Sequence, residues 1–341
     1  MNKTFKKASA AILAAIVFSG FVAKGEDGFS YRPEIHGTIR AKYEYEPPIN
    51  KGRFEIRNAR LSVEGKVLPI VSYKAEIDLS DEGAIKMLDA YVRLQPKKPV
   101  KLTLGQMRVP FTIDAHRSPH LQYFANRSFI AKQVGNVRDV GAAVAWTFLK
   151  QCPVTLEGGI FNGSGLTNQK HFWTSDYCFS LKASTMIANH VNITLSGQKT
   201  KNNDTNVYMY DVGGYYQSDR WHIEGEYLRK YYQGNAAKPV NAFDFFTAYR
   251  LPLKKYFSGI SFLGRYDYMS DHSNGKKDDA GHLGIDDPER HRLTGGITLS
   301  MGTTSLQADL RLNYEQYFYK KGVVPGISDQ NKIVAEFVVH F

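Results

Sequence analysis

The sequence predicts an all-β protein, a transmembrane antiparallel β-barrel of about 16 strands. Three observations favour this fold class. Apolar and polar residues alternate along many short segments, the links between these segments alternate between short and long, and an apolar segment suited to export lies at the start of the sequence. Alternation with a period of two gives a strand one apolar and one polar face. In lipid such strands must close into a barrel, because an open sheet edge would leave backbone groups unpaired.

The first 25 residues have the features of a secretory signal peptide. Lys3, Lys6 and Lys7 precede a small and apolar run over 8–22, and Ala23 follows as a small residue suited to cleavage. This run is shorter than the roughly 20 apolar residues that a membrane-spanning helix needs. We therefore expect residues 1–25 to be removed during export and residues 26–341 to form a single barrel domain in the bacterial outer membrane.

Alternation is clearest over 305–314. The even-numbered positions from 306 hold Leu, Ala, Leu, Leu and Tyr, whereas positions 307, 309, 311 and 313 hold Gln, Asp, Arg and Asn. The segments 71–80 and 35–44 show the same pattern. Division of the chain at its Gly, Pro, Asn and Asp clusters predicts strands at 31–45, 54–67, 71–80, 84–95, 100–110, 139–149, 153–162, 177–187, 191–200, 207–218, 220–233, 241–252, 257–270, 289–301, 305–318 and 331–341.

The links between the predicted strands test this division, because transmembrane barrels alternate short periplasmic turns with longer external loops. The short links are 68–70, 150–152, 188–190, 253–256 and 302–304. The mostly longer links of the other phase are 46–53, 111–138, 163–176, 201–206, 234–240, 271–288 and 319–330. A soluble β-sandwich or β-helix also has alternating strands, but it has no reason to sort its links in this way.

The composition is compatible with a barrel, and it limits the kinds of partner that we expect the protein to bind. Mean hydropathy is −0.37, and 21 Tyr and 20 Phe are present, which fits a barrel with a polar interior as well as a soluble protein. Without the four lysines of residues 1–25, 40 basic side chains face 33 acidic ones. This excess suits small anions, whereas nucleic acid is not an expected partner of an exported chain without a basic block. Cys152 and Cys178 are expected at opposite ends of strands, too far apart for a disulfide.

Several short motifs resemble the phosphate-selective porin O and P family of bacterial outer-membrane porins. They occur in the family's order and cover about 54–141, and beyond this range only the strand pattern is similar. The motifs are FEIRNARLSVEGK at 54–66, YKAEID at 73–78, LDAYV at 88–92, LGQMRVPF at 104–111, NRS at 126–128 and RDVG at 138–141.

The resemblance implies a 16-stranded barrel, usually trimeric, whose third external loop folds into the lumen. The 111–138 link is at the matching position, and links of this length are usually functional. The terminal Phe341 resembles the aromatic residue that the barrel-assembly machinery recognises in such proteins. Family members with strong phosphate preference carry two adjacent arginines in the second strand, whereas here Asn58 follows Arg57. The resemblance therefore implies an anion-leaning porin without establishing phosphate as the solute.

Anion-selective pores are lined by Arg and Lys, which replace the lost hydration of the passing ion. Strand alternation, the 111–138 link with the arginine just before it, and the resemblance together nominate eleven such residues. They are Arg40, Lys42, Arg57, Arg60, Lys74, Arg93, Arg108, Arg117, Arg127, Lys132 and Arg138. The alternative is that many of them form ion pairs across the barrel, since acidic residues share the same faces. His116 and His120 of the same link either make conductance depend on pH or are solvated loop histidines.

No enzyme, metal or cofactor is assigned. The link 271–288 is acidic, and its spacing favours a solvated loop over a site for Ca²⁺ or another divalent ion. Its acidic and imidazole residues are Asp271, His272, Asp278, Asp279, His282, Asp286 and Asp287. The sequence has no G-x-S-x-G, H-E-x-x-H, C-x-x-C or P-loop motif. The expected function is passive diffusion of small hydrophilic, anionic, phosphate-like solutes through a homotrimer embedded in outer-membrane lipid. Two alternatives remain: a closed or narrow barrel that binds a partner or serves envelope structure, and a lipid-active barrel enzyme.

Overall fold

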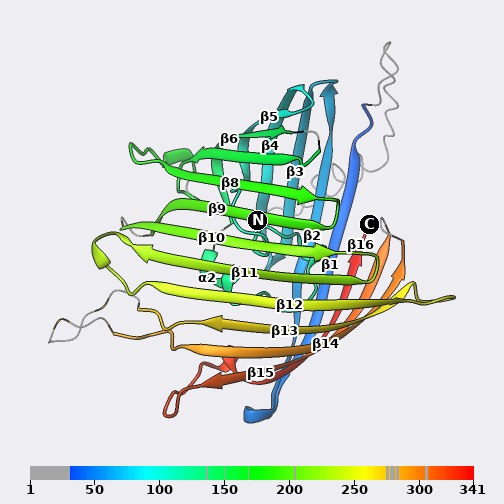
Figure 1. Ribbon diagram of the computed structural model, residues 1–341, viewed down its shortest axis with the longest axis vertical. Helices are drawn as coiled ribbons and strands as arrows, with labels where there is room; N and C mark the ends of the chain where they lie inside the picture. Colours follow the sequence, from blue (N-terminus) through cyan, green and yellow to red (C-terminus); the bar gives the residue numbers. More distant parts are fainter. Residues whose placement is uncertain are drawn as a thin grey trace, which may run out of the picture.

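The computed structural model is a closed antiparallel barrel, with sixteen strands in the described part of the chain (Figure 1). Each strand pairs with its neighbours in sequence, and β1 pairs with β16 to close the sheet. The strands are β1 Glu34–Glu46, β2 Lys51–Leu68, β3 Val71–Asp81, β4 Ala84–Lys97, β5 Val100–Arg108, β6 Arg138–Phe148, β7 Val154–Phe161, β8 Cys178–Ile187, β9 Val191–Asn202, β10 Thr205–Gln217, β11 Trp221–Tyr232, β12 Val240–Pro252, β13 Gly259–Met269, β14 Arg290–Gly302, β15 Gln307–Tyr319 and β16 Lys332–His340.

The structure describes residues 31–341 except 136, 150, 168, 203–204, 274–275, 277–280, 282–283 and 304–305. The predicted signal peptide lies outside these residues, as do Asp278, Asp279 and His282 of the acidic link. In the described part, no helix is long and apolar enough to cross a membrane. Cys152 and Cys178 are both free thiols, as expected.

The polar face of the strands points inward and the apolar face points outward. In β15, Arg311 is 2% exposed and Leu312 is 48% exposed, although the two residues are neighbours in sequence. The same inversion holds in β16, where Glu336 is fully buried and Phe337 is 45% exposed. A soluble β-sandwich buries its apolar face instead. The inverted pattern therefore excludes that alternative and matches a sheet whose outer face contacts hydrocarbon.

The predicted strands are confirmed in number, and their bounds differ by a few residues. Two links are shorter than predicted. The expected link 201–206 is reduced to 203–204 between β9 and β10, and the link before β2 is shorter because β2 begins at Lys51. The five longest links all lie at one end of the barrel. They are 109–137, 162–177, 233–239, 270–289 and 320–331. Turns of two to six residues join the strands at the other end, which is typical of the periplasmic end of such barrels.

Closure of the barrel brings the two ends of the sheet together (Figure 1). The backbones of Gly37 and Phe341 exchange two hydrogen bonds, with N···O distances of 2.7 and 3.1 Å. A Cβ atom on residue 37 would lie 2.2 Å from the ring of Phe341, so glycine leaves the space that this ring occupies. The last residue is thus part of the closing seam between β1 and β16.

The 109–137 link contains short helices and much of the buried apolar core. It carries η2 Pro119–Leu121 and α2 Phe129–Val134, and Ser128 caps α2 by accepting a hydrogen bond from the N–H of Ala131. The other short helices are η1 Pro47–Ile49, η3 Gln169–His171, η4 Gln233–Asn235 and η5 Ile327–Asp329. Phe111, Phe129 and Ile130 of this link pack against buried residues of β10–β13 and β15: Val207, Met209, Leu228, Val240, Ala242, Met269 and Tyr317.

Candidate functional site

A cavity of about 730 Å³ lies between β1, β2 and the 109–137 link, with β3, β4 and β14–β16 completing its wall. Among the described residues that line it, ten side chains are basic and three are acidic. The basic ones are Arg40, Lys42, Arg53, Arg57, Arg60, Lys86, Arg127, Lys132, Arg292 and Lys332, and the acidic ones are Glu44, Glu55 and Asp78. We call it the basic cavity.

A β-bulge in β2 shapes one side of the basic cavity. Arg40 of β1 pairs in register with Asn58, but its neighbour Ala41 pairs with Ile56, so Arg57 is the extra residue of the bulge. A bulge breaks strict alternation and re-aims side chains. For this reason Arg57, Asn58 and Arg60 all line the same cavity, which strict alternation of β2 would not allow.

Most basic side chains of the cavity make ion pairs. The buried Arg40 lies 2.6 Å from Glu336, and Arg60 lies 2.9 Å from Asp78. Further pairs join Lys42 to Glu44 at 2.7 Å, Lys132 to Asp329 at 2.8 Å, Arg292 to Asp267 at 2.8 Å and Lys332 to Glu46 at 3.3 Å. Ion pairing across the barrel, the alternative weighed for these residues, is therefore extensive. Several of the partner carboxylates, Glu336, Asp267 and Asp329 among them, are not part of the cavity lining.

Arg127 differs from these residues because it makes no ion pair with a described carboxylate. Burial lowers the pKa of its guanidinium to about 10, although Asp114 acts in the opposite direction. The positive charges of Arg57 and Arg60 add to this lowering. At neutral pH Arg127 is still charged, so the cavity contains a cation that is not ion-paired with any carboxylate in the described part of the chain. Such a charge attracts a mobile anion.

Backbone groups anchor the segment that carries Arg127. The carbonyls of Ala125, Asn126 and Arg127 accept hydrogen bonds from Arg40, Arg265 and Arg292 at 2.7, 3.1 and 2.8 Å. The N–H groups of Ala125 and Phe129 donate to Asn313 and Asp267 at 2.8 and 3.2 Å. The residues that hold this segment thus come from β1, β13, β14 and β15. Its position does not depend on the Arg127 side chain.

Residues 34–213, just over half of the chain, match the family described as phosphate-selective porin O and P. The chain belongs to this family. The resemblance of the motifs at 54–141 is thereby confirmed. No curated protein sequence matches the porin.

Solved structures share the fold of the porin at low sequence identity. The outer membrane channel DcaP of Acinetobacter baumannii aligns with a TM-score of 0.62 and 11% identity, over 91% of this chain and 97% of that one. OmpT of Vibrio cholerae in its trimer form gives 0.60 and 10%, over 91% and 99%. The anion-selective porin from Comamonas acidovorans gives 0.58 and 10%, also over 91% and 99%. These comparisons establish a porin fold.

The structure brings six of the eleven nominated residues together in the basic cavity: Arg40, Lys42, Arg57, Arg60, Arg127 and Lys132. The other five lie outside its lining. Lys74 lies 3.4 Å from Glu64, Arg93 donates to Thr103 at 3.1 Å, Arg108 donates to the carbonyl of His116, Arg117 pairs with Asp114 at 3.0 Å, and Arg138 pairs with Asp89 at 2.6 Å. Sequence reasoning missed Arg53, Lys86, Arg292 and Lys332.

The two histidines of the 109–137 link are partly buried. Burial holds the pKa of His116 well below its usual value, and burial also lowers the pKa of His120 to about 4. The ring of His120 stacks on that of His340 with centroids 3.9 Å apart. Both side chains are therefore neutral at pH 7, and neither adds to the positive charge of the porin there.

The described members of the acidic link 270–289 are engaged by different neighbours. Asp271 pairs with Lys238 at 2.6 Å, His272 bonds to the hydroxyl of Tyr232 at 2.7 Å, and Asp287 pairs with Arg290. These contacts draw the side chains toward separate partners, and we assign no Ca²⁺ site to the described part of this link.

Proposed function

We propose that the porin lets small anionic solutes, phosphate among them, diffuse passively across the outer membrane, with the basic cavity as its selective region. The observation that carries this proposal is the composition of the cavity lining, in which ten basic side chains face three acidic ones. Arg127, a cation without a carboxylate partner among the described residues, is the expected contact for a passing anion. We propose the same role for the other nominated residues of the lining, and a transport rather than an enzymatic function.

The 109–137 link is proposed to be the third external loop folded into the lumen, where it narrows the pore. Its hydrogen bonds support this position, because they reach two separate parts of the wall. Arg40, Arg265, Arg292 and Asn313 come from β1 and β13–β15. Ser196 of β9 and Glu226 of β11, which accept from the N–H groups of Thr112 and Ile113, lie across the barrel from them. The 730 Å³ of the cavity is then the space left between the loop and the wall formed by β1 and β2. A solute that crosses this space passes within reach of the cavity's guanidinium groups.

A single difference bears on phosphate itself. Asn58 occupies the place of a second adjacent arginine, and its amide donates to Asp78 at 3.1 Å. An asparagine contributes no positive charge, so one cation is missing beside Arg57. We expect phosphate to be favoured over neutral solutes, with weaker binding than two adjacent arginines would give.

Export, membrane insertion and subunit number form part of the same proposal. We propose cleavage of residues 1–25, insertion into outer-membrane lipid with help from the barrel-assembly machinery that reads Phe341, and association into a homotrimer. OmpT, which shares the fold, forms a trimer. Light scattering of the detergent-solubilised porin measures the subunit number, and a monomeric mass would refute the trimer while leaving the channel intact.

Single-channel recording in a planar bilayer tests the function. A salt gradient gives a reversal potential, and phosphate is added to compete with chloride. The proposal expects stable conductance, anion preference and a phosphate-dependent decrease of chloride current. Cation preference would refute the assignment of the basic cavity. Folded barrels that conduct no current would favour partner binding or lipid chemistry instead.

The lumen position of the loop needs its own experiment. Replacement of residues 118–124 by a short glycine linker removes η2 and leaves α2 in place. If the link narrows the pore, this variant conducts more current per channel than the intact porin. Unchanged conductance in a variant that still folds would refute the loop's role as the constriction.

A further inference from the structure

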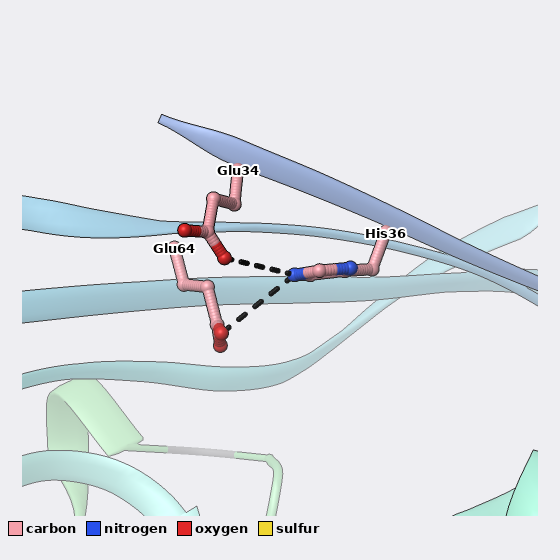
Figure 2. A group of neighbouring side chains, drawn as sticks. All are labelled: Glu34, His36 and Glu64. Atoms are coloured by element: carbon pink, nitrogen blue, oxygen red, sulfur yellow. Dashed lines mark ion pairs between the residues drawn. The ribbon is translucent and has the colours of Figure 1, made fainter. Parts of the chain in front are cut away.

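Three side chains with oxygen and nitrogen ligand atoms converge at the end of the barrel that has the short turns. Glu34 and His36 lie near the start of β1, two residues apart and therefore on one face, and Glu64 lies near the end of β2. Figure 2 shows the imidazole of His36 directed between the two carboxylates. Its Nε2 lies 3.8 Å from Glu34 Oε2 and 3.7 Å from Glu64 Oε1. One ligand atom from each residue lies within 4.8 Å of the others.

The strand register itself creates a need for a cation here. Glu34 and Glu64 are direct partners in the β1–β2 ladder. Like charges placed directly opposite each other destabilise a strand pair. Lys74 lies 3.4 Å from Glu64, but it approaches Oε2, the oxygen that does not face His36. Among the described residues, His36 is the partner of Glu34. The space between the two carboxylates thus lacks a permanent positive charge.

We propose that Glu34, His36 and Glu64 form a site for a divalent transition-metal ion, with Zn²⁺ as the best match. One imidazole and two carboxylates are a known ligand set for zinc, whereas calcium and magnesium prefer sites made of oxygen alone. Ligands at about 2.1 Å from a tetrahedral zinc are separated by about 3.4 Å. The two nitrogen–oxygen separations exceed this by a few tenths of an ångström, and all three ligand atoms lie within 4.8 Å of one another. The side chains of Glu34 and Glu64 are exposed, so they are free to rotate toward a bound ion. Three protein ligands leave a position open for water.

A bound dication would change the charge at this mouth of the pore. Two opposed carboxylates carry a charge of about −2 at neutral pH, and Zn²⁺ cancels it. The pocket that Glu34 and Glu64 line is also lined by the basic side chains of Arg32, Lys66, Lys74 and Arg93, so the bound ion would leave the mouth more positive. This inference concerns metal binding and stands whether or not the porin selects anions.

Titration of Zn²⁺ into the tag-free, refolded barrel in detergent tests the site by isothermal calorimetry. The intact porin is expected to bind one equivalent, and His36→Ala is expected to weaken that binding at least tenfold. Co²⁺ offers a second readout, because its visible absorption reports nitrogen and oxygen ligands directly. His171→Ala is the matched control, since His171 is an exposed histidine in η3, at the opposite end of the barrel.

Glu34→Gln provides a second variant that keeps side-chain size and hydrogen-bonding capacity. The heat-dependent shift of folded barrels on gels shows whether each variant is folded. Loss of binding in both His36→Ala and Glu34→Gln, with His171→Ala unchanged, supports the site. Absence of stoichiometric binding to the intact porin, or equal affinity of the intact porin and His36→Ala, would overturn it.

Discussion

Replacement of Arg127 by alanine is expected to reduce anion preference without loosening the porin. The segment around this residue is held by the backbone atoms of Ala125, Asn126, Arg127 and Phe129. The side chain itself makes no ion pair with a described carboxylate, so its removal strands no partner. The variant therefore changes the charge of the basic cavity and little else, which is rarely possible for a buried arginine.

The size of the effect follows from the dimensions of the cavity. A sphere of 730 Å³ has a radius of about 6 Å, so an anion at its centre lies about 6 Å from a charge in the wall. At this distance one charge pair contributes ~0.7 kcal/mol with the dielectric constant of water and ~2.8 kcal/mol at an effective constant of about 20. These values correspond to a factor of about 3 to 100 in anion occupancy. Salt screening favours the lower part of the range.

Reversal potentials across a KCl gradient measure the change. We expect Arg127→Ala to lower the ratio of chloride to potassium permeability at least threefold. Arg93→Ala is the matched control, because Arg93 also makes no ion pair in the described part of the chain but lies outside the lining of the basic cavity. Wild-type selectivity in Arg127→Ala, or an equal loss in Arg93→Ala, would refute the reasoning.

Three further predictions follow. Gly105→Ala should lower the urea midpoint of unfolding, because φ is +130° and the new Cβ would lie 2.3 Å from the carbonyl oxygen of Ala90, whereas Gly264→Ala, with open space around it, should not. Arg292→Met should cost about 3–5 kcal/mol of unfolding free energy, since it leaves the buried Glu315 without its ion pair and Asp267 with Arg265 alone, and equal stability would contradict this. Because the pKa of His120 is about 4, acidification adds its positive charge only near pH 4. Anion preference near pH 4 should therefore be lower in His120→Gln than in the intact porin, and a step near pH 6.5 that His120→Gln abolishes would contradict the burial of the ring.

The number and order of strands could be predicted because alternation is a local property of the sequence. Each strand shows its two faces within about ten residues, and an even total allows the first and last strands to pair antiparallel. The composition of the basic cavity could be predicted only in part. Arg57 was nominated from the family motif, but the bulge that turns it toward the cavity depends on the pairing of β2 with β1, which no local pattern specifies.

The residues that were missed depend on long-range packing. Arg292 and Lys332 lie on the polar faces of β14 and β16, where alternation would have placed them inside, but nothing local indicates that they meet β1 and the 109–137 link. Glu34, His36 and Glu64 converge because of the register of two strands, and the spacing of 28 residues between His36 and Glu64 matches no metal-binding motif. Register and loop docking are therefore the parts of this porin that its sequence does not reveal.

Charge separation, rather than net charge, explains why the cavity is basic. Four acidic side chains are buried on the opposite strands β10–β12: Asp211, Glu224, Glu226 and Asp244. Glu226 accepts hydrogen bonds from the backbone N–H groups of Ile113 and Asp114, and Glu224 pairs with Arg117. The 109–137 link thus binds to the carboxylates of β11, whereas the basic side chains of β1 and β2 line the basic cavity. A modest overall excess of basic residues becomes a cavity lined mainly by basic side chains, because the link binds two of the four acids on the other strands.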